Sequence, residues 1–188
     1  MNPYDTIKKY FDENSLGYDI LIKHSELVTK KAIQIAKYNL DKFPDLDLIK
    51  TGAMLHDIGI CKTNAKNIGC FGQDTYLKHF LYSKEIVKEE GYSKEIQNIV
   101  LTHIGCGCTV EEIEKYKFPF PKEDIIAKTV EEQIVAIADL YFSKNINDLE
   151  YEKTIDEIRQ KISKYTIRQK NIFEKWIKKY KLDKIPKL

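Results

Sequence analysis

The chain has 188 residues, the size of one ordinary domain, and a chain of this length buries roughly 70% of the surface that its unfolded form exposes. Its 31 Lys and Arg residues nearly balance 29 Asp and Glu residues, which leaves a formal net charge of +2. Because the two signs are interspersed, the charge distribution gives no reason to expect a nucleic-acid polymer or a membrane as partner. We therefore expect a single domain, residues 1–188, with one core.

The cysteines lie at positions 61, 70, 106 and 108 and form none of the C-x-x-C pairs that are typical of structural zinc sites. The chain has no signal-peptide pattern and no long apolar run, so we expect a cytoplasmic protein with reduced thiols. In an alternative interpretation, Cys106 and Cys108 supply metal ligands beside His103. The C-x-C spacing is, however, a poor geometry for one tetrahedral ion.

Apolar residues recur at helical spacing along most of the chain, and no segment alternates convincingly as a strand would. The stripe along residues 20–39 predicts a helix that carries His24 on its buried face. A second helix is predicted from the cap-capable Asp45 to Gly59, which is suited to terminate it. His56 and Asp57 then lie at the C-terminus of this helix.

Two more stripes place histidines in line with apolar residues. The first predicts a helix over residues 76–91, with His79 on its apolar side. Ser93 is then expected to cap a further helix, in which Ile96 and His103 are seven residues apart and share a face. The same pattern has thus recurred in successive helices.

The tetrapeptide Thr-Val-Glu-Glu occurs at residues 109–112 and 129–132 and matches the capping-box signature. It predicts a short helix and a longer one, on either side of a loop that contains Phe118-Pro-Phe-Pro121. The longer helix is apolar nearly all round from Ile134 to Phe142, so it is expected to be central and to carry Asp139 inside. An unpaired carboxylate there would be costly, and a cation is the simplest remedy.

Two lysine-rich helices are expected to pack on this core at about residues 150–182. The last of them is predicted to bury four residues on one side, namely Phe173, Trp176, Ile177 and Tyr180. The tyrosines and lysines of the outer helices permit a homodimer without requiring one.

The histidines and two of the aspartates share one pattern, because all six lie at buried-looking helical positions. A single histidine on an apolar face is more often a satisfied core residue than a ligand, and an adjacent His-Asp pair is weak evidence alone. Six such residues that one metal site would explain together are harder to attribute to separate accidents. The candidate metal ligands are His24, His56, Asp57, His79, His103 and Asp139.

These residues resemble the HD-domain superfamily of metal-dependent phosphohydrolases, whose pattern is H…HD…D on a helical core. The pattern corresponds to His24, His56-Asp57 and Asp139, and the resemblance covers about residues 18–145. It implies an all-α, single-domain helical bundle of the HD-domain type. His79 and His103 match the H…HD…H…H…D variant, which implies a two-metal centre. More narrowly, the chain resembles small uncharacterised HD-domain proteins, through stretches such as THIGCGCTVEEIE and TVEEQIVAIAD.

The ligand set implies a specific chemistry. One ion is expected on His24, His56, Asp57 and Asp139, and Asp57 would bridge to a second ion on His79 and His103. A mixed nitrogen and oxygen shell suits divalent Fe, Mn, Co, Ni or Zn better than Mg or Ca. Two such ions would convert water to hydroxide, which attacks a phosphate ester of a small molecule or nucleotide.

A basic residue is expected to assist at the phosphate. Lys62, five residues after Asp57, is the first candidate for a catalytic contact, and Lys78 and Lys144 are further candidates. HD proteins that cleave nucleotides often carry HD-x-G-K, whereas here the lysine stands two positions later. Phe71, in the segment before His79, is predicted to stack on an aromatic substrate.

Two other functions remain open at this point. The same six ligands support mixed-valence di-iron oxygenases, which cleave C–C or C–P bonds. A third possibility is a non-catalytic metal-binding or nucleotide-binding module in which the metal only braces the fold.

Overall fold

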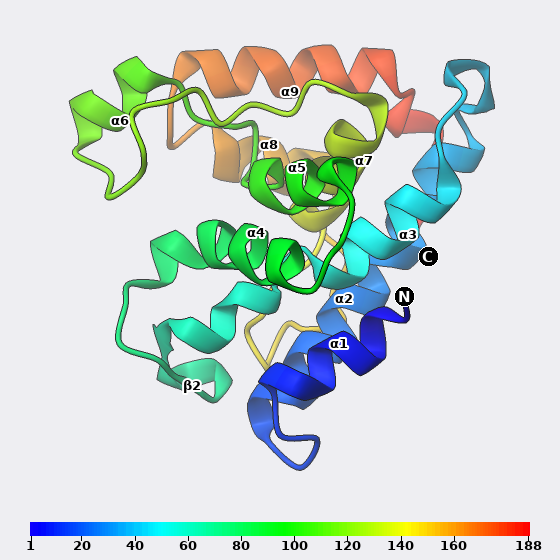
Figure 1. Cartoon of the computed structure of the whole chain (residues 1–188). Coiled ribbons are helices and arrows are strands. Elements are labelled where there is room, and N and C mark those ends of the chain that lie inside the picture. The colour runs from blue at the N-terminus through cyan, green and yellow to red at the C-terminus, as the bar shows by residue number, and fades with distance from the viewer.

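The computed structural model describes residues 1–188 and contains nine α-helices (Figure 1). They are α1 (Pro3–Tyr10), α2 (Leu16–Lys37), α3 (Leu46–Leu55), α4 (His79–Glu89), α5 (Lys94–Thr102), α6 (Val110–Tyr116), α7 (Val130–Leu140), α8 (Ile155–Ile162) and α9 (Ile167–Lys179). Five short 3-10 helices lie between or after them: η1 (Leu40–Lys42), η2 (Ile58–Lys62), η3 (Lys66–Ile68), η4 (Tyr76–Lys78) and η5 (Leu182–Lys184). The predicted all-α bundle is confirmed.

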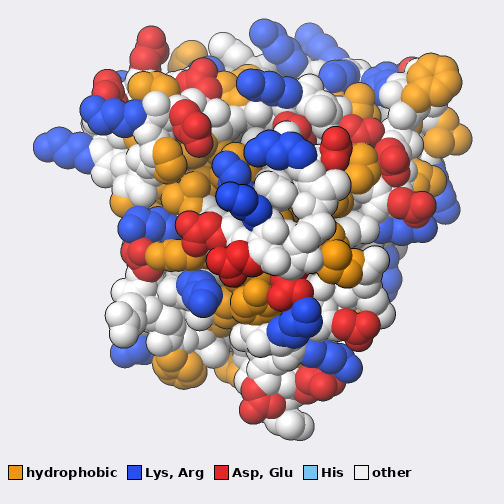
Figure 2. Space-filling view, viewed as in Figure 1, with side chains coloured by type: hydrophobic (Ala, Val, Ile, Leu, Met, Phe, Trp, Pro, Cys, Tyr) orange, Lys and Arg blue, Asp and Glu red, His pale blue; other side chains and the backbone are white.

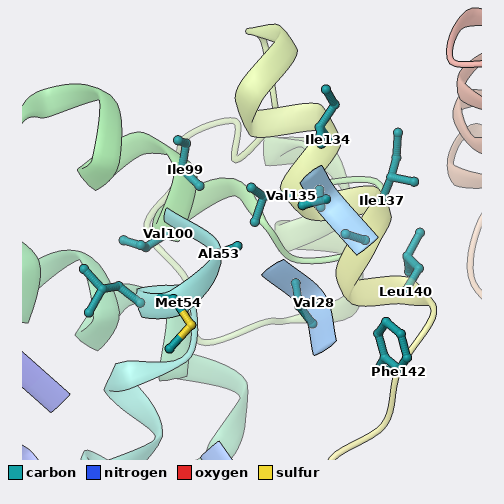
Figure 3. Close-up of a cluster of buried hydrophobic side chains, with 14 of the residues drawn as sticks. Val28, Ala53, Met54, Ile99, Val100, Ile134, Val135, Ile137, Leu140 and Phe142 are labelled. Carbon is teal, nitrogen blue, oxygen red and sulfur yellow. The ribbon is translucent and has the colours of Figure 1, made fainter. Parts of the chain in front are cut away.

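The core forms where α2, α3, α5 and α7 pack together, and Figure 3 shows side chains from all four helices converging. The helix α7 is its centre, because every residue from Ile134 to Ala138 is fully buried. Val28 of α2 and Ala53 of α3 pack beside it. The continuous apolar run of α7 and the stripe of α2 therefore produce the burial that their patterns predict.

Polar side chains at the helix N-termini explain where the helices begin. Ser93 accepts a hydrogen bond from the backbone of α5, as predicted. Thr109 and Glu112 form the complete predicted capping box at α6. At α7 only half of the box is present, because the Glu132 carboxylate accepts from the Lys128 backbone N–H (2.7 Å) instead.

The C-terminal helices α8 and α9 lie against each other, and α9 crosses the top of the view in Figure 1. The four residues predicted to be buried by the last helix are buried, from Phe173 to Tyr180. Lysine and arginine alternate with acidic side chains over the face that Figure 2 shows. None of the helices has the length and apolar character needed to cross a membrane.

A small hairpin departs from the expected pattern. The strands β1 (Asn64–Ala65) and β2 (Cys70–Phe71) pair antiparallel around η3. Two residues per strand are too few to show the alternation by which strands are recognised. The helix α3 also ends earlier than predicted, at Leu55, so Gly59 lies within η2 and does not terminate the helix.

Candidate metal centre

The six predicted ligands come from five helical segments that meet in the interior. His24 is in the middle of α2, where Leu21 and Val28 flank it on the buried face. His56 and Asp57 join α3 to η2, whereas His79 begins α4 and His103 follows α5. Asp139 lies one residue before the end of α7. All four histidines and Asp57 are buried.

A first group of ligand atoms gathers around His24, His56, Asp57 and Asp139. The Nε2 atom of His24 lies 3.0 Å from Asp139 Oδ1 and 3.3 Å from His56 Nε2. His56 Nε2 lies 2.9 Å from Asp57 Oδ2. All four ligand atoms lie within 4.8 Å of one another, so this group can hold one metal ion.

A second group forms on the other side of Asp57. His79 Nε2 and His103 Nε2 are 3.1 Å apart. They lie 3.4 Å and 3.5 Å from Asp57 Oδ1, respectively. The two oxygens of one carboxylate therefore face two different groups, Oδ2 the first and Oδ1 the second, which is the arrangement of a bridging ligand.

Hydrogen bonds orient three of the imidazoles. Nδ1 of His56 donates to the carbonyl oxygen of Ala53 (2.6 Å), and Nδ1 of His103 donates to that of Val100 (2.8 Å). Nδ1 of His79 likewise donates to the carbonyl oxygen of Tyr76 (2.8 Å). Because a carbonyl can only accept, each Nδ1 carries a proton, and Nε2 is the ring atom that faces the centre.

Charge is concentrated at the first group. Burial raises the pKa of Asp57, but the charges of His56 and Lys144 outweigh it and hold that pKa well below its usual range. Burial opposes the charge on His56 as well, yet the nearby aspartates raise its pKa to about 9, so a metal ion would have to displace a proton from this ring. The pKa of His79 falls to about 3, mainly because the ring is buried. Negative charge at the aspartates thus attracts cations to this end.

The donor set fits a pair of divalent transition metals. It consists of imidazole nitrogens and carboxylate oxygens, a mixture that suits Fe, Mn, Co, Ni or Zn better than Mg or Ca. Asp57 Oδ1 is buried and no hydrogen-bond donor satisfies it. An ion on the second group would satisfy this oxygen, which otherwise carries a desolvation cost.

Lys144, and not Lys62, supplies the lysine at the centre. Its Nζ lies 2.6 Å from Asp57 Oδ2, and the side chain is largely buried. Lys62 is exposed and does not line the adjoining cavity. Lys62 ends η2, and five residues at about three per turn do not bring it onto the same face as Asp57. Lys78 pairs with Asp74 instead (2.9 Å).

Neither cysteine of the C-x-C segment joins the centre. Cys106 and Cys108 are buried, and neither belongs to either ligand group. Burial raises the pKa of Cys106 to about 12 and that of Cys108 to about 11, so both are neutral thiols at physiological pH.

A contact that sequence reasoning missed holds the segment after His103. Arg168 of α9 pairs with Glu112 through Nε (2.9 Å) and one terminal nitrogen (2.6 Å). The same guanidinium donates to the carbonyl oxygens of Gly107 (2.7 Å) and Cys106 (3.4 Å). Helix α9 thereby anchors the loop that follows a predicted ligand, and no sequence signal links residues this far apart.

Replacement of Arg168 by alanine is expected to lower the free energy of unfolding by about 2 kcal/mol, because it leaves the Glu112 carboxylate and two carbonyls without their charged donor. Urea unfolding measures this change. The exposed Lys170 on the same helix is the matched control, and its alanine variant should stay within about 0.5 kcal/mol of wild type. Equal stabilities of the two variants would contradict the anchoring role.

A cavity of about 970 Å³ opens at this centre. His79, His103, Asp139 and Lys144 line one part of it. Reactants can therefore reach both ligand groups, whereas His24, His56 and Asp57 lie behind the wall.

Comparisons with known proteins agree with this architecture. A family model described as HD domain matches residues 21–143, which include all six candidate ligands. Two tRNA (cytidine(56)-2'-O)-methyltransferases, from Picrophilus torridus and Thermoplasma volcanium, are 38% and 32% identical over 64% and 76% of this chain. The matches cover 31% and 37% of those proteins, so the chain spans about a third of their length. An uncharacterized protein of Methanocaldococcus jannaschii is 28% identical over 84% of this chain and 80% of its own.

Solved structures with the same fold come from the phosphodiesterase PgpH of L. monocytogenes. Its HD domain has a TM-score of 0.52 and 20% identity, over 95% of this chain and 86% of the other. The same domain in complex with cyclic-di-AMP has a TM-score of 0.52 and 22% identity, over 89% and 91%. These identities show a shared fold only. The family model, which matches most of the chain, establishes that the protein belongs to the HD-domain family.

Proposed function

We propose that the protein is a metal-dependent phosphohydrolase that hydrolyses a phosphate ester of a small molecule or nucleotide. The observation that carries this proposal is the Asp57 carboxylate, whose two oxygens face two separate groups of ligands beside an open cavity. The PgpH domain that shares the fold is a phosphodiesterase and has been captured with cyclic-di-AMP, which supports a nucleotide as the substrate.

The proposed ligands would hold two ions. His24, His56 and Asp139 would hold one divalent ion, His79 and His103 a second, and Asp57 both. When bound, such a pair supplies Lewis-acid neutralisation of phosphoryl oxygens and makes water acidic enough to attack at neutral pH. The burial of the ligands lowers the local dielectric constant, which strengthens these electrostatic effects.

Lys144 is proposed to neutralise charge on the transferred phosphoryl group. Its side chain is largely buried, and its ammonium pairs with Asp57. Lys144 lines the same cavity as His79 and His103. The negative charge of Asp57 and Asp139 raises the pKa of Lys144 well above its usual value, despite burial. The side chain is thus a permanent cation where charge would develop.

The direct test is hydrolysis of a panel of phosphomonoesters and phosphodiesters with Mn²⁺, Co²⁺, Ni²⁺, Zn²⁺ or Fe²⁺. We expect turnover of at least one ester that disappears in His56→Ala. Full activity with Mn²⁺ under anaerobic conditions would exclude the di-iron oxygenase. Absence of turnover with every metal, together with oxygen consumption by the iron form, would instead contradict the proposal.

Replacement of Lys144 by alanine is expected to lower kcat/KM by about 100-fold, the usual cost of one preorganised charged donor at a transition state. Lys62→Ala is the matched control and should stay within about twofold of wild type, an effect below 0.5 kcal/mol. Steady-state kinetics with the best ester of the panel compares the two variants. The opposite ranking would return the assisting role to Lys62.

A further inference from the structure

The cavity beside the metal centre is much larger than a phosphate group needs. At about 970 Å³ it lies at the upper end of the range of roughly 300–1,000 Å³ that is typical of small-molecule pockets. Only one part of it is formed by the candidate ligands and Lys144. The rest of its wall is therefore available to a part of the substrate that does not react.

Aromatic rings form a continuous series from the metal centre along this wall. The ring of His79 meets that of Phe80 edge-on, with centroids 5.8 Å apart. Phe80 meets Phe120 in the same way at 4.9 Å, and Phe120 stacks on Phe118 at 5.2 Å with the planes 20° apart. All four rings line the cavity. The series thus leads from a candidate ligand to two half-buried rings.

Prolines restrict the backbone of the loop that carries these two rings. Pro119 and Pro121 each follow one of the phenylalanines, and the ring of proline restricts both its own backbone and that of the preceding residue. Phe118 also donates its backbone N–H to the Ile113 carbonyl (3.0 Å). A planar group could stack on this preformed surface without first having to order it.

The segment joining α8 to α9 adds a further ring beside Phe118 and Phe120. This segment lies outside the residues that the family model matches. Tyr165 lines the same cavity, and 60% of its surface is exposed. Gln169 lies one turn further along and also lines it. Its amide Nε2 donates to the Gly107 carbonyl (3.2 Å), which orients the group and leaves Oε1 without a protein donor.

We propose that Phe118, Phe120 and Tyr165 form a subsite for a planar heteroaromatic group of the substrate, of the nucleobase kind. The rings supply stacking surfaces, which accept any base because every base has a π-face. The oriented Gln169 oxygen can accept from an exocyclic amine. The inference rests on the proposed function for the phosphate end, whereas the ring end stands on the aromatic wall alone.

The first experiment tests the ring end without phosphate or metal. Adenosine, cytidine and ribose are titrated against the whole protein, and backbone amide signals are followed by NMR. We expect both nucleosides, but not ribose, to shift the signals of Phe118, Phe120 and Tyr165. Tyr165→Ala should weaken nucleoside binding about five- to tenfold, the worth of one aromatic stacking contact. Tyr38→Ala, a similarly exposed tyrosine away from the cavity, should bind like wild type.

Nucleosides that leave these signals unshifted up to their solubility limit would overturn the subsite. So would equal binding by wild type and Tyr165→Ala, since Tyr165 is too exposed for its loss to be masked by unfolding.

A second experiment separates the subsite from the reaction. For the metal-loaded enzyme, kcat/KM for AMP should exceed that for ribose 5-phosphate about tenfold or more, and Tyr165→Ala or Phe118→Ala should reduce the ratio. Equal kcat/KM values for the two esters would overturn the subsite and leave the hydrolase intact. Nucleoside binding without hydrolysis of any ester would support the subsite and overturn the hydrolase.

Discussion

Replacement of Asp57 by alanine is expected to abolish hydrolysis and to leave the protein with at most one bound metal ion. Asp57 is the only residue shared by both ligand groups, and its two oxygens face them separately. Losing a bridging ligand removes several kcal/mol of charge stabilisation at the transition state, so activity should fall by more than about 1,000-fold. Metal analysis after dialysis and single-turnover kinetics measure the two effects.

Thermal unfolding distinguishes a metal-binding residue from one that only supports the fold. Metal that binds the folded state stabilises it by about 2.7 kcal/mol when its concentration is 100 times the Kd. Wild type should therefore gain Tm when Mn²⁺ or Zn²⁺ is added, whereas Asp57→Ala should lose most of that gain. Asp41→Ala, an exposed aspartate outside the centre, should respond like wild type. A full metal-induced gain in Asp57→Ala would contradict the bridging role.

Replacement of Gly59 by alanine is expected to destabilise the protein by more than about 4 kcal/mol or to prevent folding. A Cβ atom at this position would lie 2.1 Å from the carbonyl oxygen of His79 and 2.2 Å from the backbone nitrogen of Ser83. Both atoms belong to the backbone of α4, so the clash cannot be relieved by a side-chain rotation. The Gly59 N–H also donates to Ser83 Oγ (2.9 Å), which holds η2 against α4.

The close approach at Gly59 matters for the metal centre, because it sets the separation of His56 and Asp57 from His79. Gly105→Ala is the matched control, since a Cβ there meets nothing within 4 Å. Its backbone is left-handed (φ +53°), so this variant should cost about 1 kcal/mol. Urea unfolding compares the two. Similar stabilities for both alanine variants would show that η2 and α4 tolerate a wider separation.

The helical core was predictable because its signals are local. The stripe around His24 and the apolar run of α7 are each contained in one helix, and burial follows directly from such patterns. Caps such as Ser93 act within one turn and were equally readable. The residues that the structure gathers as candidate ligands were also identified, since the apolar neighbours of each histidine showed that it would face inward.

Features that depend on distant contacts were not predictable. The sequence indicates a helix stop at Gly59, whereas in the structure Gly59 contacts α4, a helix that begins 20 residues later. Sequence distance from Asp57 favours Lys62 over Lys144, but Lys62 is exposed and Lys144 is the one that lines the cavity. Phe71 is predicted from the sequence to stack on the substrate, but it is 74% exposed and does not line the cavity. Phe80, next to His79 in the sequence, lines the cavity instead.

We propose that one interior centre holds two divalent ions, and metal stoichiometry tests this most directly. Wild type and His103→Ala are dialysed against Mn²⁺ or Zn²⁺ and analysed by inductively coupled plasma mass spectrometry. We predict two ions per chain in wild type and one in His103→Ala, because the first group keeps all of its ligands. A single ion in wild type, or the same content in both proteins, would contradict the two-ion centre.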